Sequence, residues 1–109
     1  MIAATRTLRI VGDDGDIDVP VHIHIPVEDD RAWRCDYEIG WPQDPRRGYA
    51  LGFDAVQALC IALQGVSRDL YFSRYHGAGL LIWDETEPGY GFPVGGGLED
   101  LAVGRDKRP

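Results

Sequence analysis

The chain has 109 residues, a length typical of one domain that can bury roughly 60–70 % of its unfolded surface. Its 18 acidic residues outnumber 11 basic ones, giving a formal net charge of −7, and this balance argues against a nucleic-acid-binding protein, because phosphate contacts need a basic face. The apolar runs are shorter than the ~20 residues of a membrane span, and the first residues lack the apolar segment of a signal peptide.

Alternating apolar residues predict two strands near the N-terminus. The first covers Thr5 to Val11, and Asp14-Gly15 is a strong hairpin signal after it. The second covers Ile17 to Ile25, with the odd-numbered apolar residues on one face and His22 and His24 on the other. The prolines at positions 20 and 26 cannot donate to a ladder, so part of this strand is expected at an edge or a bulge.

The middle of the chain predicts one more strand and a long loop. Trp33 to Ile39 alternates again, with Cys35 and Tyr37 on the apolar side. We expect Gly40 to Leu51, which carries two prolines, to be an irregular or functional loop. After the helix described next, Leu80 to Trp83 reads as a fourth strand and Tyr90 to Val94 as a short edge strand.

One segment has a clear helical period, from Asp54 to Tyr71 or Phe72. Asp54 is predicted to accept the backbone N–H of Gln57, and Gln57 to reach back to Asp54. Six residues recur at three- and four-residue steps on one stripe: Ala55, Leu59, Ala62, Leu63, Val66 and Leu70. This stripe is expected to cover the apolar face of the strands.

These elements predict an α+β domain, an antiparallel sheet of three to five strands with one long helix packed on one face, in the order β-β-β-α-β. Residues 1–94 would form this single domain, and residues 95–109, which begin Gly95-Gly96-Gly97, a flexible C-terminal tail. The two cysteines, Cys35 and Cys60, have no CxxC spacing and suggest a reduced, cytoplasmic protein.

Several apolar residues of the predicted helix do not belong to its stripe. Ile61 lies on the opposite side, and Val56 and Cys60 flank it. Either the proline-containing loop or the C-terminal tail covers these residues, or they form a surface for self-association or for a partner protein.

His22 and His24 are the candidate metal ligands. Two histidines two positions apart on a strand point the same way and can share one metal ion. If the strands pair antiparallel, Asp36 or Glu38 would face the same side and add a carboxylate. The alternative is a solvent-facing surface on which these side chains form ordinary cross-strand pairs.

Arg74, Tyr75 and His76 form a second candidate site just after the helix, where they could anchor a partner or an anionic ligand. The alternative is a helix-end cluster that packs on Trp83. No segment contains a nucleophile motif, a phosphate-binding loop or a cofactor motif. The sequence therefore implies no catalytic residue and no cofactor.

Two segments resemble a family of small bacterial domains of unknown function. The run from Gly52 to Leu59 matches a G-x-D-x-x-Q-A-L helix start, and Gly89 to Val94 matches a G-Y-G-F-P-like closing segment. The resemblance implies a stand-alone cytosolic protein and carries no catalytic residues. Some small acidic bacterial α+β proteins of this size are immunity proteins, which by analogy suggests a partner protein.

The sequence therefore favours a non-catalytic protein-interaction module that binds a basic protein or itself, with no nucleic-acid or membrane partner. Val56, Ile61, Arg74, Tyr75 and His76 are the candidate partner-binding residues. The alternative is a small ligand- or metal-binding protein, or an enzyme, that uses either His22 and His24 or the corner at Arg74, Tyr75 and His76.

Overall fold

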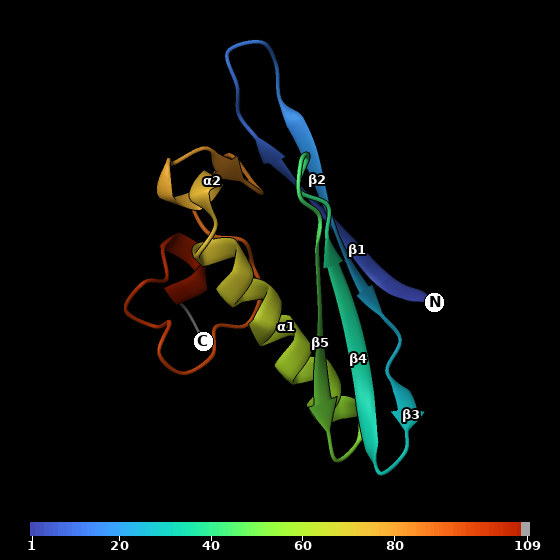
Figure 1. The fold of residues 1–109 in the computed structure, drawn as a ribbon. Helices are drawn as coiled ribbons and strands as arrows, with labels where there is room; N and C mark the ends of the chain where they lie inside the picture. The colour runs from blue at the N-terminus through green and yellow to red at the C-terminus, as the bar shows by residue number, and fades with distance from the viewer. Residues whose placement is uncertain (108–109) are drawn as a thin grey trace.

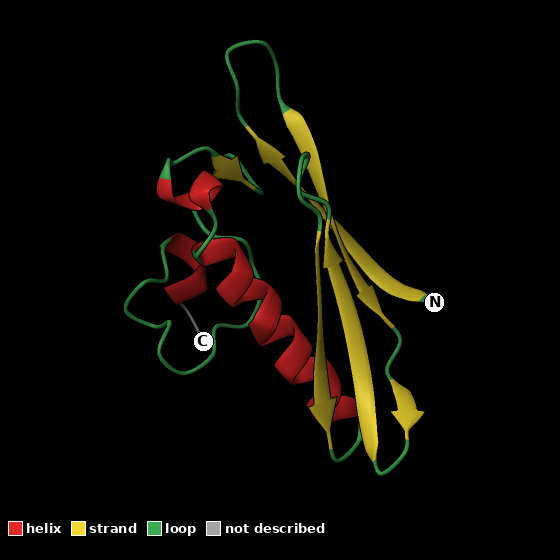
Figure 2. Ribbon diagram, in the orientation of Figure 1, coloured by secondary structure: helices red, strands yellow, loops and turns green. Residues whose placement is uncertain are grey.

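The protein is an antiparallel six-stranded sheet with one long helix packed across one face (Figure 1, Figure 2). The computed structural model describes residues 1–107, so Arg108 and Pro109 of the predicted tail lie outside the described residues. The elements in chain order are β1 (Ile2–Ile10), β2 (Ile17–His24), β3 (Val27–Asp29), β4 (Ala32–Ile39), β5 (Arg46–Gly52), α1 (Ala55–Tyr71), α2 (Arg74–Gly77), β6 (Leu81–Ile82) and a 3₁₀ turn (Gly104–Lys107).

The sheet is organised around β4. One edge of β4 pairs with β5, and the other pairs first with β3 and then with β2. β2 and β3 thus occupy one position in the sheet, interrupted at Pro26 as the proline pattern indicates. β1 follows β2, and β6 pairs only with Arg9 and Ile10 of β1. The α+β class is confirmed, but the predicted strand count and the order β-β-β-α-β are wrong.

The core lies between α1 and the apolar face of the sheet. The alternation predicted for β2 and β4 is present over most of both strands: three alternating residues of each are buried, whereas Ile17 is exposed and Trp33 is only partly buried. The largest of the fully buried side chains come from both layers: Leu8, Val19, Val21, Cys35, Ile39, Val66, Ser67 and Leu70.

The segment from Gly40 to Leu51, for which the sequence predicts a loop, contains most of the strand β5, which begins at Arg46. The residues of β5 that face the helix are small. Gly48 lies against the ring of Tyr37, where an added Cβ would be 2.3 Å from a ring atom, and Ala50 is buried. Its large residues, Tyr49 and Leu51, are exposed on the opposite face. This inverted pattern gives no apolar alternation, which is why the strand was missed.

The helix α1 begins as predicted, at Asp54. The Asp54 carboxylate accepts the N–H of Gln57 at 2.8 Å, whereas the Gln57 side chain accepts from the N–H of Phe53 at 2.6 Å rather than from Asp54. The predicted stripe is rotated slightly: Ala58 is fully buried, whereas Leu59 is only partly buried. Gly52 approaches the backbone at Ala58 so closely that only glycine fits there, because an added Cβ would lie 2.4 Å from the Ala58 nitrogen.

The chain after β6 packs without regular strands. No strand forms at the predicted edge segment Tyr90–Val94 in the described chain; instead Gly91 has a φ of +79°, which breaks an extended run. An added Cβ at Gly91 would lie 2.4 Å from the ring of Trp83. Residues 95–107 run beside the second half of α1 (Figure 1), and Leu98 and Ala102 are buried.

Candidate functional site

The sheet face opposite α1 carries the two candidate metal ligands. Across residues 1–107, no helix packs on this face (Figure 2). His22 and His24 lie there because they alternate with the buried residues of β2. The strand register places Thr5, His22, Glu38 and Arg47 in one row across four strands.

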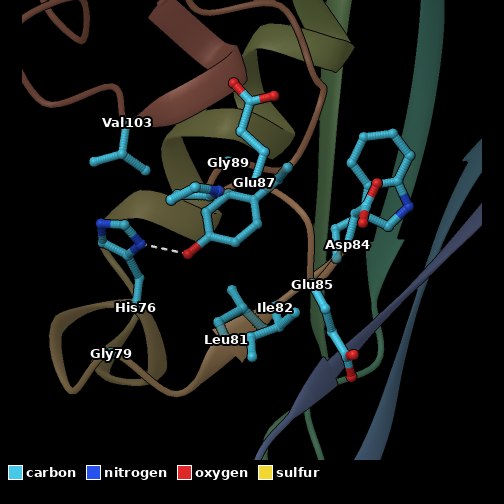
Figure 3. A pocket seen from close by; sticks show the side chains of 12 residues that line it. His76, Gly79, Leu81, Ile82, Asp84, Glu85, Glu87, Gly89 and Val103 are labelled. Carbon is cyan, nitrogen blue, oxygen red and sulfur yellow. Dashed lines mark hydrogen bonds between the residues drawn. The ribbon is translucent and has the colours of Figure 1, made fainter.

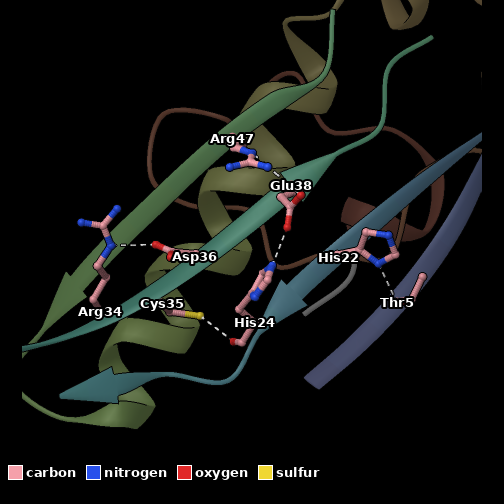
Figure 4. A network of polar contacts seen from close by, with 8 residues as sticks. All are labelled: Thr5, His22, His24, Arg34, Cys35, Asp36, Glu38 and Arg47. Atoms are coloured by element: carbon pink, nitrogen blue, oxygen red, sulfur yellow. Dashed lines mark hydrogen bonds and ion pairs between the residues drawn. The ribbon is translucent and has the colours of Figure 1, made fainter. Parts of the chain in front are cut away.

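The polar side chains on this open face are paired with one another (Figure 4). His22 Nδ1 lies 2.9 Å from Thr5 Oγ1, and His24 Nε2 lies 2.5 Å from Glu38 Oε1. The hydrogen bond with His24 holds the pKa of Glu38 below its ordinary value. The two histidines therefore have separate partners.

Within the described residues, no three His, Cys, Asp or Glu side chains are arranged to hold a metal ion. The expected carboxylate is present, since Glu38 bonds His24, but Asp36 accepts a hydrogen bond from Arg34 Nε at 2.7 Å. Metal binding at His22 and His24 stays a prediction, and a metal would have to recruit ligands that are now engaged elsewhere.

Arg74, Tyr75 and His76 belong to the short helix α2 (Arg74–Gly77). Arg74 and Tyr75 line a surface hollow beside Trp41, whereas His76 lines a different one. Tyr75 stacks on Trp41 with ring centroids 5.1 Å apart and accepts a hydrogen bond from Arg74 at 2.9 Å. Tyr75 thus packs on Trp41 rather than on Trp83. His76 instead lines a separate cavity.

That cavity has a volume of about 310 Å³ and mixes aromatic, aliphatic and acidic walls (Figure 3). His76 Nδ1 is hydrogen-bonded to the hydroxyl of Tyr90. Burial lowers the pKa of His76 and raises that of Tyr90, so the neutral forms of both groups are favoured. Its carboxylates are already engaged: Asp84 pairs with Arg105 at 3.1 Å and Glu85 with Arg9 at 2.7 Å.

Asp106, which the sequence placed in the tail, fastens the chain beside this cavity. Its carboxylate accepts hydrogen bonds from the Tyr71 hydroxyl at 2.5 Å, from the Tyr90 N–H at 2.9 Å and from the Gly91 N–H at 2.8 Å. Sequence reasoning missed this role. The nearest signal was the Gly-Tyr-Gly spacing at Gly89 to Gly91, because both glycines have positive φ and the turn presents the N–H groups of Tyr90 and Gly91 to one acceptor.

The candidate partner-binding residues of α1 are exposed. We define the α1 outer face by six residues, all exposed and none charged: Phe53, Val56, Gln57, Cys60, Ile61 and Gln64. Phe53 is 92 % exposed, Val56 69 % and Ile61 41 %. Residues 95–98 lie beside Ile61 and Gln64 but leave both exposed, and Val56 is exposed as well, so the expected cover is only partial within the described chain.

Comparison with known proteins gives one match. Residues 4–94 match the model of a family described as a domain of unknown function (DUF6968). No curated protein and no solved structure matches the chain. Among the described helices, none has the length and apolar character needed to cross a membrane.

Proposed function

We propose that this chain, which belongs to the family of a domain of unknown function (DUF6968), is a protein-interaction module that pairs with a second copy through the α1 outer face. One observation carries the proposal: three large apolar residues, Phe53, Val56 and Ile61, are exposed before and along the first half of a helix whose other side is buried in the core. Exposed apolar residues grouped on one face are typical of interaction surfaces.

Charge favours a second copy as the occupant of this face. Two chains that each carry a net charge of −7 repel one another least where both surfaces are uncharged. The six residues of the α1 outer face are uncharged, and the exposed charges Asp54 and Arg68 lie at its two ends. A two-fold axis would pair the face with itself, so that Val56 of one copy meets the far end of the face on the other. A basic partner would instead be drawn to acidic surfaces elsewhere.

The expected dimer is weak. The face spans 12 residues, from Phe53 to Gln64, which is about 18 Å of helix at 1.5 Å per residue. A contact of this length falls below the roughly 800 Å² per partner of a standard stable interface. We therefore expect the dimer to form at micromolar concentrations and above, with fast exchange.

Sedimentation velocity over a concentration series tests this proposal. Wild-type protein should shift from monomer to dimer, and Val56→Asp should remain monomeric because a buried unpaired carboxylate would oppose the contact. Val27→Asp, which changes an exposed valine on β3, is the matched control and should dimerise like wild type. A wild-type monomer at all concentrations, or equal dimerisation of both variants, would overturn the proposal.

Ligand binding is the second candidate function, favoured by the cavity beside His76. Its aromatic and aliphatic walls, with His76 and Tyr90 paired to each other and the carboxylates of Asp84 and Glu85 paired with arginines, suit a small, mostly apolar ligand. Native mass spectrometry of freshly purified protein should show an added mass that Val103→Phe, which fills the cavity, removes. A bare protein mass would reject this candidate.

A further inference from the structure

The outer edge of β1 is a strand edge without a partner. On the side away from β2, β1 pairs with β6 only at Arg9 and Ile10, and the N–H of Val11 donates to Leu80. From Ile2 to Leu8, no strand of the described chain pairs with this edge. The free length matches an average strand of five to six residues.

This edge has few of the features that usually protect an exposed strand: a register shift between Ile2 and Ala4, and the inward-turned Arg6. Its first four residues, Ile2 to Thr5, are uncharged and exposed, and the strand contains no proline. The one charged side chain in the unpaired stretch, Arg6, is turned toward Trp83. Natural edge strands are commonly blunted by lysine, proline or a bulge. From Ala4 to Leu8 the edge has none of these three, so this stretch is suited to pairing with another strand.

A pocket of about 210 Å³ lies next to the middle of the edge. Apolar groups from four parts of the chain form most of its wall: Ala4, Ile23, Leu63, Phe92 and Pro93. Arg6 is its one charged lining residue. The pocket is on the helix side of the sheet, because Arg6 alternates with the exposed Thr5 and Thr7 and shares a face with buried Leu8.

Arg6 has an unusual environment for a guanidinium group. It donates one hydrogen bond, to the carbonyl of Tyr90 at 3.1 Å, and its Cζ lies 3.9 Å from the ring centroid of Trp83. No ion pair joins it to a carboxylate within residues 1–107. Burial, together with the nearby charge of Arg105, lowers its pKa. A partly desolvated guanidinium with most of its N–H donors free is a favourable contact for a carboxylate.

We propose that the β1 edge and this pocket bind an extended segment of another protein, which adds as a strand, inserts an apolar side chain into the pocket and places a carboxylate on Arg6. Residues two positions apart in a strand lie on the same face. The recognised pattern is therefore an apolar residue and an Asp or Glu separated by one residue.

A second copy of β1 is a poorer occupant of the same edge. The strand from Ile2 to Ile10 contains two arginines and no acidic residue. Pairing two β1 strands would bring a second Arg6 toward the first and supply no carboxylate. Like charges placed together in this way oppose association. The partner is therefore a chain of different sequence.

Fluorescence anisotropy with a labelled seven-residue peptide tests the proposal. The probe is Thr-Val-Thr-Val-Thr-Glu-Thr with blocked ends, in which both valines and the glutamate share a face. Replacing its Glu by Gln should weaken binding by about 10-fold or more, since a hydrogen bond to a charged group contributes about 1.5–3 kcal/mol. Ala4→Leu, which fills the pocket, should abolish binding, and Thr7→Ala, on the opposite face, should leave it unchanged.

Amide hydrogen exchange gives a direct second readout. Peptide binding should slow exchange within Ile2–Leu8, where the unpaired edge lies, and leave β5 unchanged. Equal affinity for the Glu and Gln peptides, binding by Ala4→Leu, or protection outside β1 would each overturn the proposal. Val56 does not line the pocket beside β1. Val56→Asp should therefore bind the peptide as wild type does, which separates this proposal from the pairing of two copies through α1.

Discussion

Asp106→Asn should destabilise the protein strongly. The carboxylate accepts hydrogen bonds from Tyr71, Tyr90 and Gly91 at 2.5–2.9 Å. Asparagine keeps one acceptor oxygen and turns an NH₂ group toward the remaining donors, so at least one donor loses its acceptor. Hydrogen bonds to a charged group contribute about 1.5–3 kcal/mol each, which gives an expected loss of about 2–4 kcal/mol.

Urea and thermal unfolding followed by circular dichroism measure this loss. For a domain of this size, about 2–4 kcal/mol corresponds to a fall in Tm of about 10–20 °C. Asp100→Asn is the matched control, because Asp100 is exposed in the same C-terminal segment. A loss below about 0.5 kcal/mol, or an equal loss in the control, would show that Asp106 does not fasten the segment after β6.

Four further variants probe the core and its polar groups. Leu70→Ala should lower the free energy of unfolding in urea by about 2–5 kcal/mol. Leu59→Ala should lower it clearly less, because Leu70 is fully buried and Leu59 only partly. Equal losses would contradict this difference in burial. Burial, together with the hydrogen bond that its hydroxyl donates to the Asp69 carboxylate of α1, raises the pKa of Tyr37 from 10.0 to about 12. Its folded state therefore favours the protonated hydroxyl, and the associated stability should be lost between pH 10 and 12; Tyr37→Phe should reduce that loss, and an unchanged pH profile would refute the assignment. Ser67→Ala should leave stability equal or slightly higher, since its buried hydroxyl has no partner in the described chain; a loss above about 1 kcal/mol would reveal a missed bond.

The elements predicted well from sequence are those with strong local patterns. The alternation in β2 and the cap at Asp54 both depend on neighbouring residues, and the structure contains both. Exposure of Val56 and Ile61 also follows from helical geometry alone. For these residues the local sequence and the packing agree.

The missed features depend on contacts between distant residues. β5 is held by the small residues that allow Tyr37 and α1 to approach, and such packing leaves no periodic apolar signal. Asp106 bonds Tyr71 across 35 positions. The division of α2 between Trp41 and the His76 cavity likewise depends on where β4 ends and β6 begins. None of these pairings can be read from a local window.

Cross-linking through Cys60 tests the proposed pairing of two copies most directly. Cys60 is an exposed free cysteine on the α1 outer face, whereas Cys35 is buried. Packed helices lie about 8–10 Å apart, so facing Cys60 residues fall within reach of a short bismaleimide. If two copies pair through the α1 outer face, the reagent should give a covalent dimer for wild type and none for Cys60→Ser or Val56→Asp. A wild-type protein that stays monomeric under the same conditions, or a Val56→Asp variant that cross-links equally, would contradict it.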